Sequence, residues 1–168
     1  MKVVQKPGDQ FAHDNMPPTH LQPKFINLDV APQSAPFNCA EELLDKAIDE
    51  GHAKKIAIYS SDTQWTYGQL LEKTNQIAHV LREDFGLVAG NRVLLRSANK
   101  PMLLACWLAV VKAGGIVVTT IAMLRAKEIA NIAQQSNAEF ALCDLQLKDE
   151  LEAAAEQIDQ LSKILYFN

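Results

Sequence analysis

The fold of this chain is decided by Asn99-Lys-Pro-Met-Leu-Leu-Ala-Cys-Trp-Leu-Ala-Val-Val-Lys-Ala-Gly-Gly-Ile-Val-Val-Thr-Thr120. Every residue from Met102 to Val111 is apolar, so this part predicts a helix that is buried on nearly all sides. Lys112 and the two glycines after it interrupt the run well before the roughly 20 apolar residues that a membrane span needs. The stretch therefore belongs to the core of an α/β domain.

Both ends of this helix carry recognisable signals. Asn99 can cap its start, and Pro101 can occupy the first turn, where a missing N–H costs nothing. Gly114 or Gly115 can take the left-handed conformation that ends a helix. The β-branched residues 116–118 then predict a short interior strand.

Strands and helices alternate on both sides of this stretch. Because the strands are apolar rather than alternating in polarity, they predict an α/β fold with a doubly wound, mostly parallel sheet and helices on both faces. The chain stops on the last residues of an apparent strand, which predicts a piece of a longer protein. The predicted elements are strand 92–95, helix 124–135, strand 140–143, a helix marked by Leu147, Leu151, Ala154 and Ile158, and strand 163–167.

The first half of the chain divides at residue 36. Residues 1–36 hold six of the seven prolines and predict an extended arm, which Phe25 and Ile26 could attach to the body. Residues 37–168 predict one α/β subdomain. It opens with two capping-box spacings, each starting a helix, with a β-hairpin between those helices: Asn38 to Glu41, Thr66 to Gln69, and hairpin strands 55–59 and 64–65.

Composition excludes several classes of partner. A chain of 168 residues with 48% hydrophobic content suits one globular unit. Its net charge of -4 comes from interspersed acids and bases, so neither nucleic acid nor a membrane surface is an expected partner. Cys39, Cys106 and Cys143 are odd in number and lack metal or redox spacing, which favours free thiols in the cytoplasm.

The residues themselves predict no active site. The chain contains neither a GxGxxG nor a GxxxxGK[ST] phosphate loop, and no serine or cysteine lies in a nucleophile motif. Its four histidines are far apart, so no metal site is expected. Trp65 and Trp107 could line a ligand cleft, but core packing is their ordinary role, as it is for Cys106. We therefore assign no catalytic and no metal-binding residue.

Four motifs nevertheless occur in a family order, with the family's spacing. The chain resembles the N-terminal part of the AMP-forming acyl- and aryl-CoA synthetases, which belong to the adenylate-forming superfamily. The segment from Pro17 to Phe25, with 38–40 and 123–127, is most similar to the benzoate and 2-aminobenzoate CoA ligases. The four motifs are Trp65 to Leu70, Gly90 to Leu95, Trp107 to Gly115 and Leu124 to Ile129.

This resemblance implies a ligase that joins an aromatic or other carboxylic acid to CoA through an acyl-adenylate, with ATP and Mg²⁺ as cofactors. The family's phosphate loop, adenylate-binding motifs and catalytic lysine have no counterpart in this chain, so the resemblance implies an inactive fragment whose partner is the remainder of the protein. It also implies a CoA-phosphate contact for the basic residue after the strand that follows the helix. Met123 stands at the aligned position, and Arg125 lies two residues on. The contact therefore falls to Arg125, for which a solvated or acid-paired arginine is the competing interpretation.

Two further interpretations stay open. The chain could be a stand-alone α/β interaction or scaffold domain that keeps the fold without the chemistry. A flavodoxin-like nucleotide binder would need a glycine-bearing phosphate loop after the first parallel strand, where this chain has Ser97-Ala98-Asn99. In the ligase fragment, apolar surface left exposed is expected to favour self-association.

Overall fold

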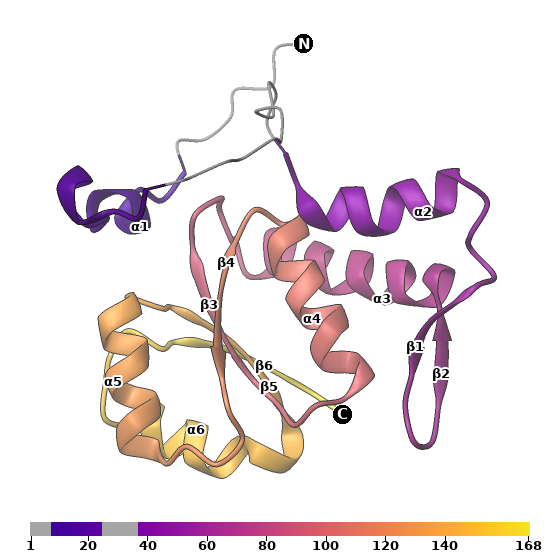
Figure 1. Cartoon of the computed structure of the whole chain (residues 1–168). Helices are drawn as coiled ribbons and strands as arrows, with labels where there is room; N and C mark the ends of the chain where they lie inside the picture. The colour runs from indigo at the N-terminus through magenta and orange to yellow at the C-terminus, as the bar shows by residue number, and fades with distance from the viewer. Residues whose placement is uncertain (1–7, 25–36) are drawn as a thin grey trace.

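The computed structural model describes residues 8–24 and 37–168. Its centre is a parallel sheet of four strands in the order β4-β3-β5-β6 (Figure 1). The two central strands, β3 and β5, are buried along their whole length. The prediction of a parallel sheet is therefore confirmed. The strands are β3 (Arg92–Arg96), β4 (Ile116–Thr120), β5 (Phe140–Asp144) and β6 (Lys163–Phe167).

Helices cover both faces of this sheet, as a doubly wound fold requires. On one face α4 (Pro101–Lys112) packs through Cys106 and Val110 against β3 and β5. On the other face α5 (Ala126–Ser136) and α6 (Lys148–Ala155) close a separate cluster, which contains Leu94 of β3. Within the described part of the chain, no helix is long and apolar enough to cross a membrane.

An outer layer covers the far side of α4. It comprises a π-helical turn η2 (Glu41–Asp45) that continues into α2 (Lys46–Asp49), then α3 (Tyr67–His79) with its π-helical end η3 (Val80–Asp84), and a hairpin of β1 (Ile56–Tyr59) and β2 (Gln64–Thr66). Leu44, Leu70 and Leu108 form its buried core with α4.

The predicted caps of this layer can be checked atom by atom. Asn38 Oδ1 accepts from the Ala40 N–H at 3.0 Å, so Asn38 caps the first helix, but no hydrogen bond among the described residues joins it to Glu41 as the predicted capping box requires. Thr66 makes the complete capping box with Gln69, because Thr66 Oγ1 accepts from the Gln69 N–H and Gln69 Oε1 from the Thr66 N–H. Capping residues of this kind can be predicted from sequence because their hydrogen-bond partners lie only two or three residues away.

The start and the surface of α4 differ from the prediction. Lys100, not Asn99, is the N-cap residue, and it makes no side-chain cap, while Pro101 occupies the first turn as expected. Leu104 is 42% exposed, so the helix is not buried on nearly all sides. The sheet and α3 cover only part of its circumference. Gly114, with φ of 84°, ends the helix as predicted.

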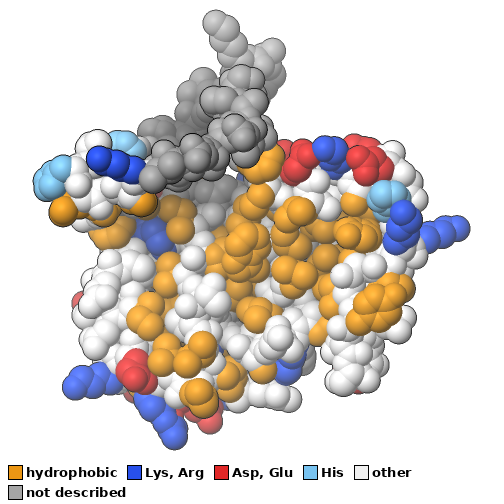
Figure 2. All heavy atoms as spheres, viewed as in Figure 1, with side chains coloured by type: hydrophobic (Ala, Val, Ile, Leu, Met, Phe, Trp, Pro, Cys, Tyr) orange, Lys and Arg blue, Asp and Glu red, His pale blue; other side chains and the backbone are white. Residues whose placement is uncertain are grey.

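Strand β4 also differs from the prediction. Residues 116–118 were expected inside the sheet, yet β4 pairs only with β3 and lies at the edge of the described strands. Ile116 is 38% exposed for this reason. Figure 2 shows hydrophobic side chains gathered in the middle of the face that carries β4 and α4. An apolar strand sequence indicates that helices cover the faces of the strand. It does not indicate where the strand lies in the order of the sheet.

The described part of the N-terminal arm contacts the chain at the amino end of β3. It contains a short helix α1 (Phe11–Asp14) and a 3-10 turn η1 (Thr19–Leu21). The Asp9 N–H donates to the Ala89 carbonyl at 2.7 Å, and the Asp9 carboxylate pairs with Arg92 at 2.8 Å. The expected attachment through Phe25 and Ile26 lies outside the described residues.

Candidate functional site

The carboxyl ends of the parallel strands mark the place where a ligand is expected. The chain leaves β3 for α4 on one face and leaves β5 for α6 on the other, so the connections diverge between these two neighbouring strands. In open α/β sheets, ligands bind outside the carboxyl ends of the strands at such a switch point. The loops that follow β3, β4 and β5 therefore define the candidate site.

A cavity of about 470 Å³ lies among these loops. Its lining combines Arg96 at the end of β3, residues 122–125 after β4, and Gln146, Leu147, Asp149 and Glu150 around the short 3-10 turn η4 (Leu145–Leu147) and the start of α6. Two arginines and two acids thus face one hollow. Local charge is balanced rather than strongly basic.

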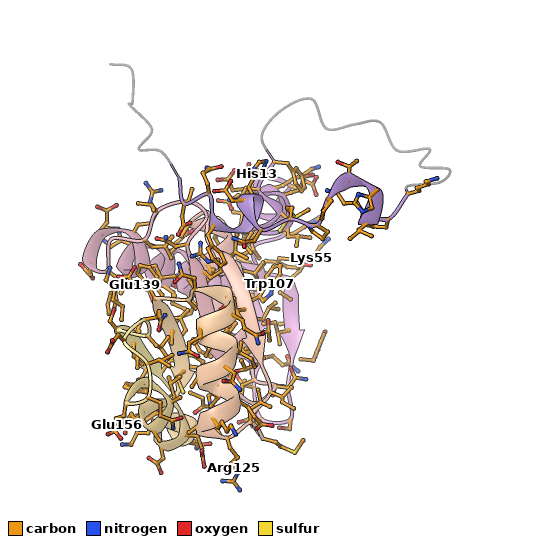
Figure 3. All side chains as sticks on the ribbon, turned by 90° about the vertical axis from the view of Figure 1, so that its left-hand side faces the viewer. His13, Lys55, Trp107, Arg125, Glu139 and Glu156 are labelled. Atoms are coloured by element: carbon orange, nitrogen blue, oxygen red, sulfur yellow. The ribbon has the colours of Figure 1, made fainter. Side chains whose placement is uncertain are left out.

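Arg125 stands at the rim of this cavity. Figure 3 shows it at the bottom of the view, at the start of α5, with His13 at the top. Its side chain is 79% exposed, and its Nη1 donates to Glu150 Oε1 at 2.8 Å. This hydrogen bond raises the pKa of Arg125 and lowers that of Glu150. Arg125 is therefore both solvated and acid-paired, and most of its guanidinium still faces water.

The N-terminus of α5 lies beside the cavity, and two of its backbone donors already have carboxylate partners. The Ala126 N–H donates to Glu150 Oε2 at 2.8 Å, and the Arg125 N–H donates to Glu128 Oε2 at 2.9 Å. A helix N-terminus attracts anions through its free N–H groups and its dipole. Here two carboxylates satisfy two of those groups, and the guanidinium of Arg125, which is largely exposed, is the more accessible donor for an anion.

A second polar cluster lies where β5 ends. Asp144 is 1% exposed, and its Oδ2 lies 2.6 Å from Lys100 Nζ. Its Oδ1 accepts from the Gln146 N–H at 3.0 Å. Burial alone would raise the pKa of Asp144, but the hydrogen bonds from Lys100 and Gln146 outweigh it and hold the pKa below its usual value. Asp144 is thus a buried anion that joins the loops after β3 and β5.

The aromatic and thiol side chains considered from sequence have packing roles. Trp107 is half-buried and contacts the core clusters on both sides of α4, and Trp65 packs at the edge of the outer one. Burial raises the pKa of the Cys106 thiol to about 12, so it is an unreactive core residue.

The comparisons with known proteins agree with this architecture. The family model for AMP-binding enzymes matches residues 44–167. The chain belongs to this family. The 3-hydroxybenzoate/4-hydroxybenzoate CoA ligase of Thauera aromatica is 23% identical over 129 residues, which make up 77% of this chain and 24% of that protein. A medium/long-chain-fatty-acid/3-oxocholest-4-en-26-oate CoA ligase of Mycolicibacterium smegmatis is 39% identical over 77 residues, 46% of this chain and 14% of that protein.

Solved structures share the fold over a similar range. The anthranilate CoA ligase AuaEII, solved with anthranoyl-AMP, aligns with a TM-score of 0.72 at 21% identity, covering 78% of this chain and 25% of that one. The benzoate CoA ligase from Burkholderia xenovorans LB400 aligns with a TM-score of 0.71 at 23% identity. The alignment covers 79% of this chain and 26% of that one. The predicted resemblance to the N-terminal part of such ligases is confirmed. The chain spans 14% to 26% of the length of these relatives.

Sequence reasoning overlooked two buried charged residues of the site. Arg96 is 1% exposed and Asp144 equally so. Both follow apolar strand residues at the carboxyl end of a strand, which is where functional side chains of α/β folds concentrate. This position in the sequence could have identified them, because a charged residue at the end of a buried strand needs hydrogen-bond partners in the neighbouring loops.

Proposed function

We propose that this chain is the N-terminal part of an AMP-forming acid–CoA ligase, which activates an aromatic carboxylate with ATP and passes the acyl group to CoA. The observation that carries the proposal is the AMP-binding family match over residues 44–167. The hydroxybenzoate CoA ligase relative, matched over 77% of this chain, supports an aryl substrate. The buried free thiols of Cys106 and Cys143 suit a cytoplasmic enzyme.

The residues of this chain do not fit ATP and Mg²⁺ by themselves. The sequence carries no glycine-rich phosphate loop. Among residues 8–24 and 37–168, no group of three or more metal-ligating side chains could hold a cation. We accordingly assign no adenylation step to these residues, and the 168-residue chain alone is expected to be inactive.

Two measurements separate the ligase from a scaffold domain. Exchange of radiolabelled pyrophosphate into ATP by the complete protein, tested against a panel of aryl and alkyl acids, should be stimulated by an aryl acid. The 168-residue chain should release no pyrophosphate with the same acid. Absence of exchange with every acid would favour the stand-alone interaction domain. Pyrophosphate release by the short chain, abolished by a substitution within it, would overturn the assignment of catalysis to the remainder.

Arg125 is the residue of this chain that we assign to CoA, as a contact to one of its phosphates. Its guanidinium has five N–H donors, of which one bonds Glu150, and it stands 79% exposed beside the cavity. A guanidinium can donate two parallel hydrogen bonds to a phosphate, a geometry that lysine and methionine lack.

The Arg125→Ala variant of the complete ligase tests this assignment. The apparent KM for CoA should rise about tenfold, because one charge-assisted contact is lost. Pyrophosphate exchange without CoA should stay nearly unchanged. Arg82→Ala is the matched control, because Arg82 is also exposed but lies outside this cavity. An unchanged CoA dependence would leave Arg125 as a surface residue paired with Glu150.

A further inference from the structure

Arg96 carries a buried positive charge that is held by backbone carbonyls. Its side chain points to the α5/α6 side of the sheet, like that of Leu94 two residues earlier, and it is 1% exposed. Nε donates to the Leu147 carbonyl at 3.2 Å, and Nη1 to that of Ile121 at 3.1 Å. Nη2 donates to the carbonyls of both Ala122 and Leu124 at 3.0 Å. Four of the five guanidinium donors are thereby used on two loops.

These carbonyls belong to the segments that present Arg125 and Glu150. Residues 121–124 form the turn between β4 and Arg125, and Leu147 lies three residues before Glu150. The Arg125 and Glu150 side chains then meet at 2.8 Å above the cavity. Arg96 therefore bonds both the turn before Arg125 and the segment before Glu150. Its own side chain lines the same cavity.

We infer that Arg96 is a positioning residue, which fixes the turn 121–124 so that the Arg125 guanidinium stands at the mouth of the cavity where CoA is to bind. This inference rests on the proposed role of Arg125. Its physical basis is the planar fork of a guanidinium, whose five donors can bond carbonyls lying in different directions. A lysine has three donors on one compact ammonium and reaches fewer of these carbonyls at once.

The chain provides a matched control on the same strand. Arg92 is 4% exposed, and its guanidinium donates to the carbonyls of Gly90, Ser136 and Asn137 at 2.7 to 2.9 Å. Thus α5 is held by one buried arginine at each end, Arg96 before its start and Arg92 at its finish. Arg92 lies at the amino edge of the sheet, away from the cavity, so its loss perturbs packing without reaching Arg125.

The test uses the complete ligase with Arg96→Met, Arg96→Lys, Arg92→Met and Arg125→Ala. Arg96→Met should raise the apparent KM for CoA about tenfold, a loss comparable to one contact, with pyrophosphate exchange changed less than about twofold. Arg96→Lys should be intermediate, and Arg92→Met should leave the CoA dependence unchanged. Because Arg96 acts through Arg125, the double variant Arg96→Met/Arg125→Ala should have the CoA KM of Arg125→Ala alone.

Hydrogen exchange of backbone amides supplies a readout that is independent of CoA. In Arg96→Met the amides of residues 121–126 should exchange faster, whereas those of β3 and β5 stay protected. Unchanged exchange in this turn would overturn the positioning role. So would a normal CoA KM in Arg96→Met when Arg125→Ala raises it. If Arg125→Ala has no effect but the turn loosens in Arg96→Met, the CoA role of Arg125 fails while the support of the turn by Arg96 stands.

Discussion

At the scale of single residues, Gly90 determines how closely the N-terminal arm approaches the sheet. Its φ is 89°, and a Cβ placed on it would overlap the Asp9 carbonyl oxygen. Only a residue without a side chain allows Asp9 to reach Arg92 and Asn91. The docking of the arm thus depends on one missing methyl group.

Gly90→Ala should therefore release the arm as well as strain the turn. Gly86→Ala is the matched control, because Gly86 also has a positive φ, 71°, but no atom lies within 4 Å of the place where its added methyl group would sit. The backbone strain alone costs about 1 to 2 kcal/mol in either variant. Gly90→Ala should lose about 1 kcal/mol more in urea unfolding, and protease should cut its arm faster. Equal losses in the two variants would show that the docked arm contributes no stability.

Asp144 should make stability depend on acid pH. Its folded pKa lies below the ordinary value of 3.8, so the native state binds fewer protons than the unfolded state near that pH. The stabilisation from its hydrogen bonds is therefore complete above about pH 4 and is lost as pH falls through the lower folded pKa. In Asp144→Asn the free energy of unfolding should fall less steeply as the pH is lowered below about 4, which urea unfolding over a pH series measures. Asp14→Asn, at a side chain that is 69% exposed, should leave the acid part of this pH dependence unchanged.

At the scale of elements, α4 has two leucines one turn apart in very different surroundings. Leu108 is 3% exposed and Leu104 is 42% exposed. In urea unfolding of the 168-residue chain, Leu108→Ala should cost about 3 kcal/mol and Leu104→Ala about 1 kcal/mol or less. The half-buried Trp107 should fall between them, at about 2 kcal/mol on truncation to alanine. Equal costs at the two leucines would mean that something covers both faces of α4.

These elements also show which signals a sequence carries. The Thr66 capping box, the stop at Gly114 and the apolar strands are local, so their positions could be predicted from neighbouring residues alone. The edge position of β4 could not, because strand order depends on crossovers between distant segments. The same holds for the site. Arg125 was proposed through a family resemblance, whereas the role of Arg96 could not be predicted because its carbonyl partners lie 25 to 51 residues away.

At the scale of the whole molecule, the exposed apolar surface should make the 168-residue chain associate with itself. The edge strand β4 offers unpaired backbone groups within the described sheet, with Ile116 beside them at 38% exposure, and Met123 beyond its end is 80% exposed. Open edges of this kind pair with other chains unless charge blocks them. Sedimentation velocity over a concentration series should show reversible growth in mass. Ile116→Lys should suppress it, whereas Met16→Lys, on the arm, should not. A chain that stays monomeric throughout would favour the stand-alone domain, since a severed piece of a ligase retains the surface that its remainder would cover.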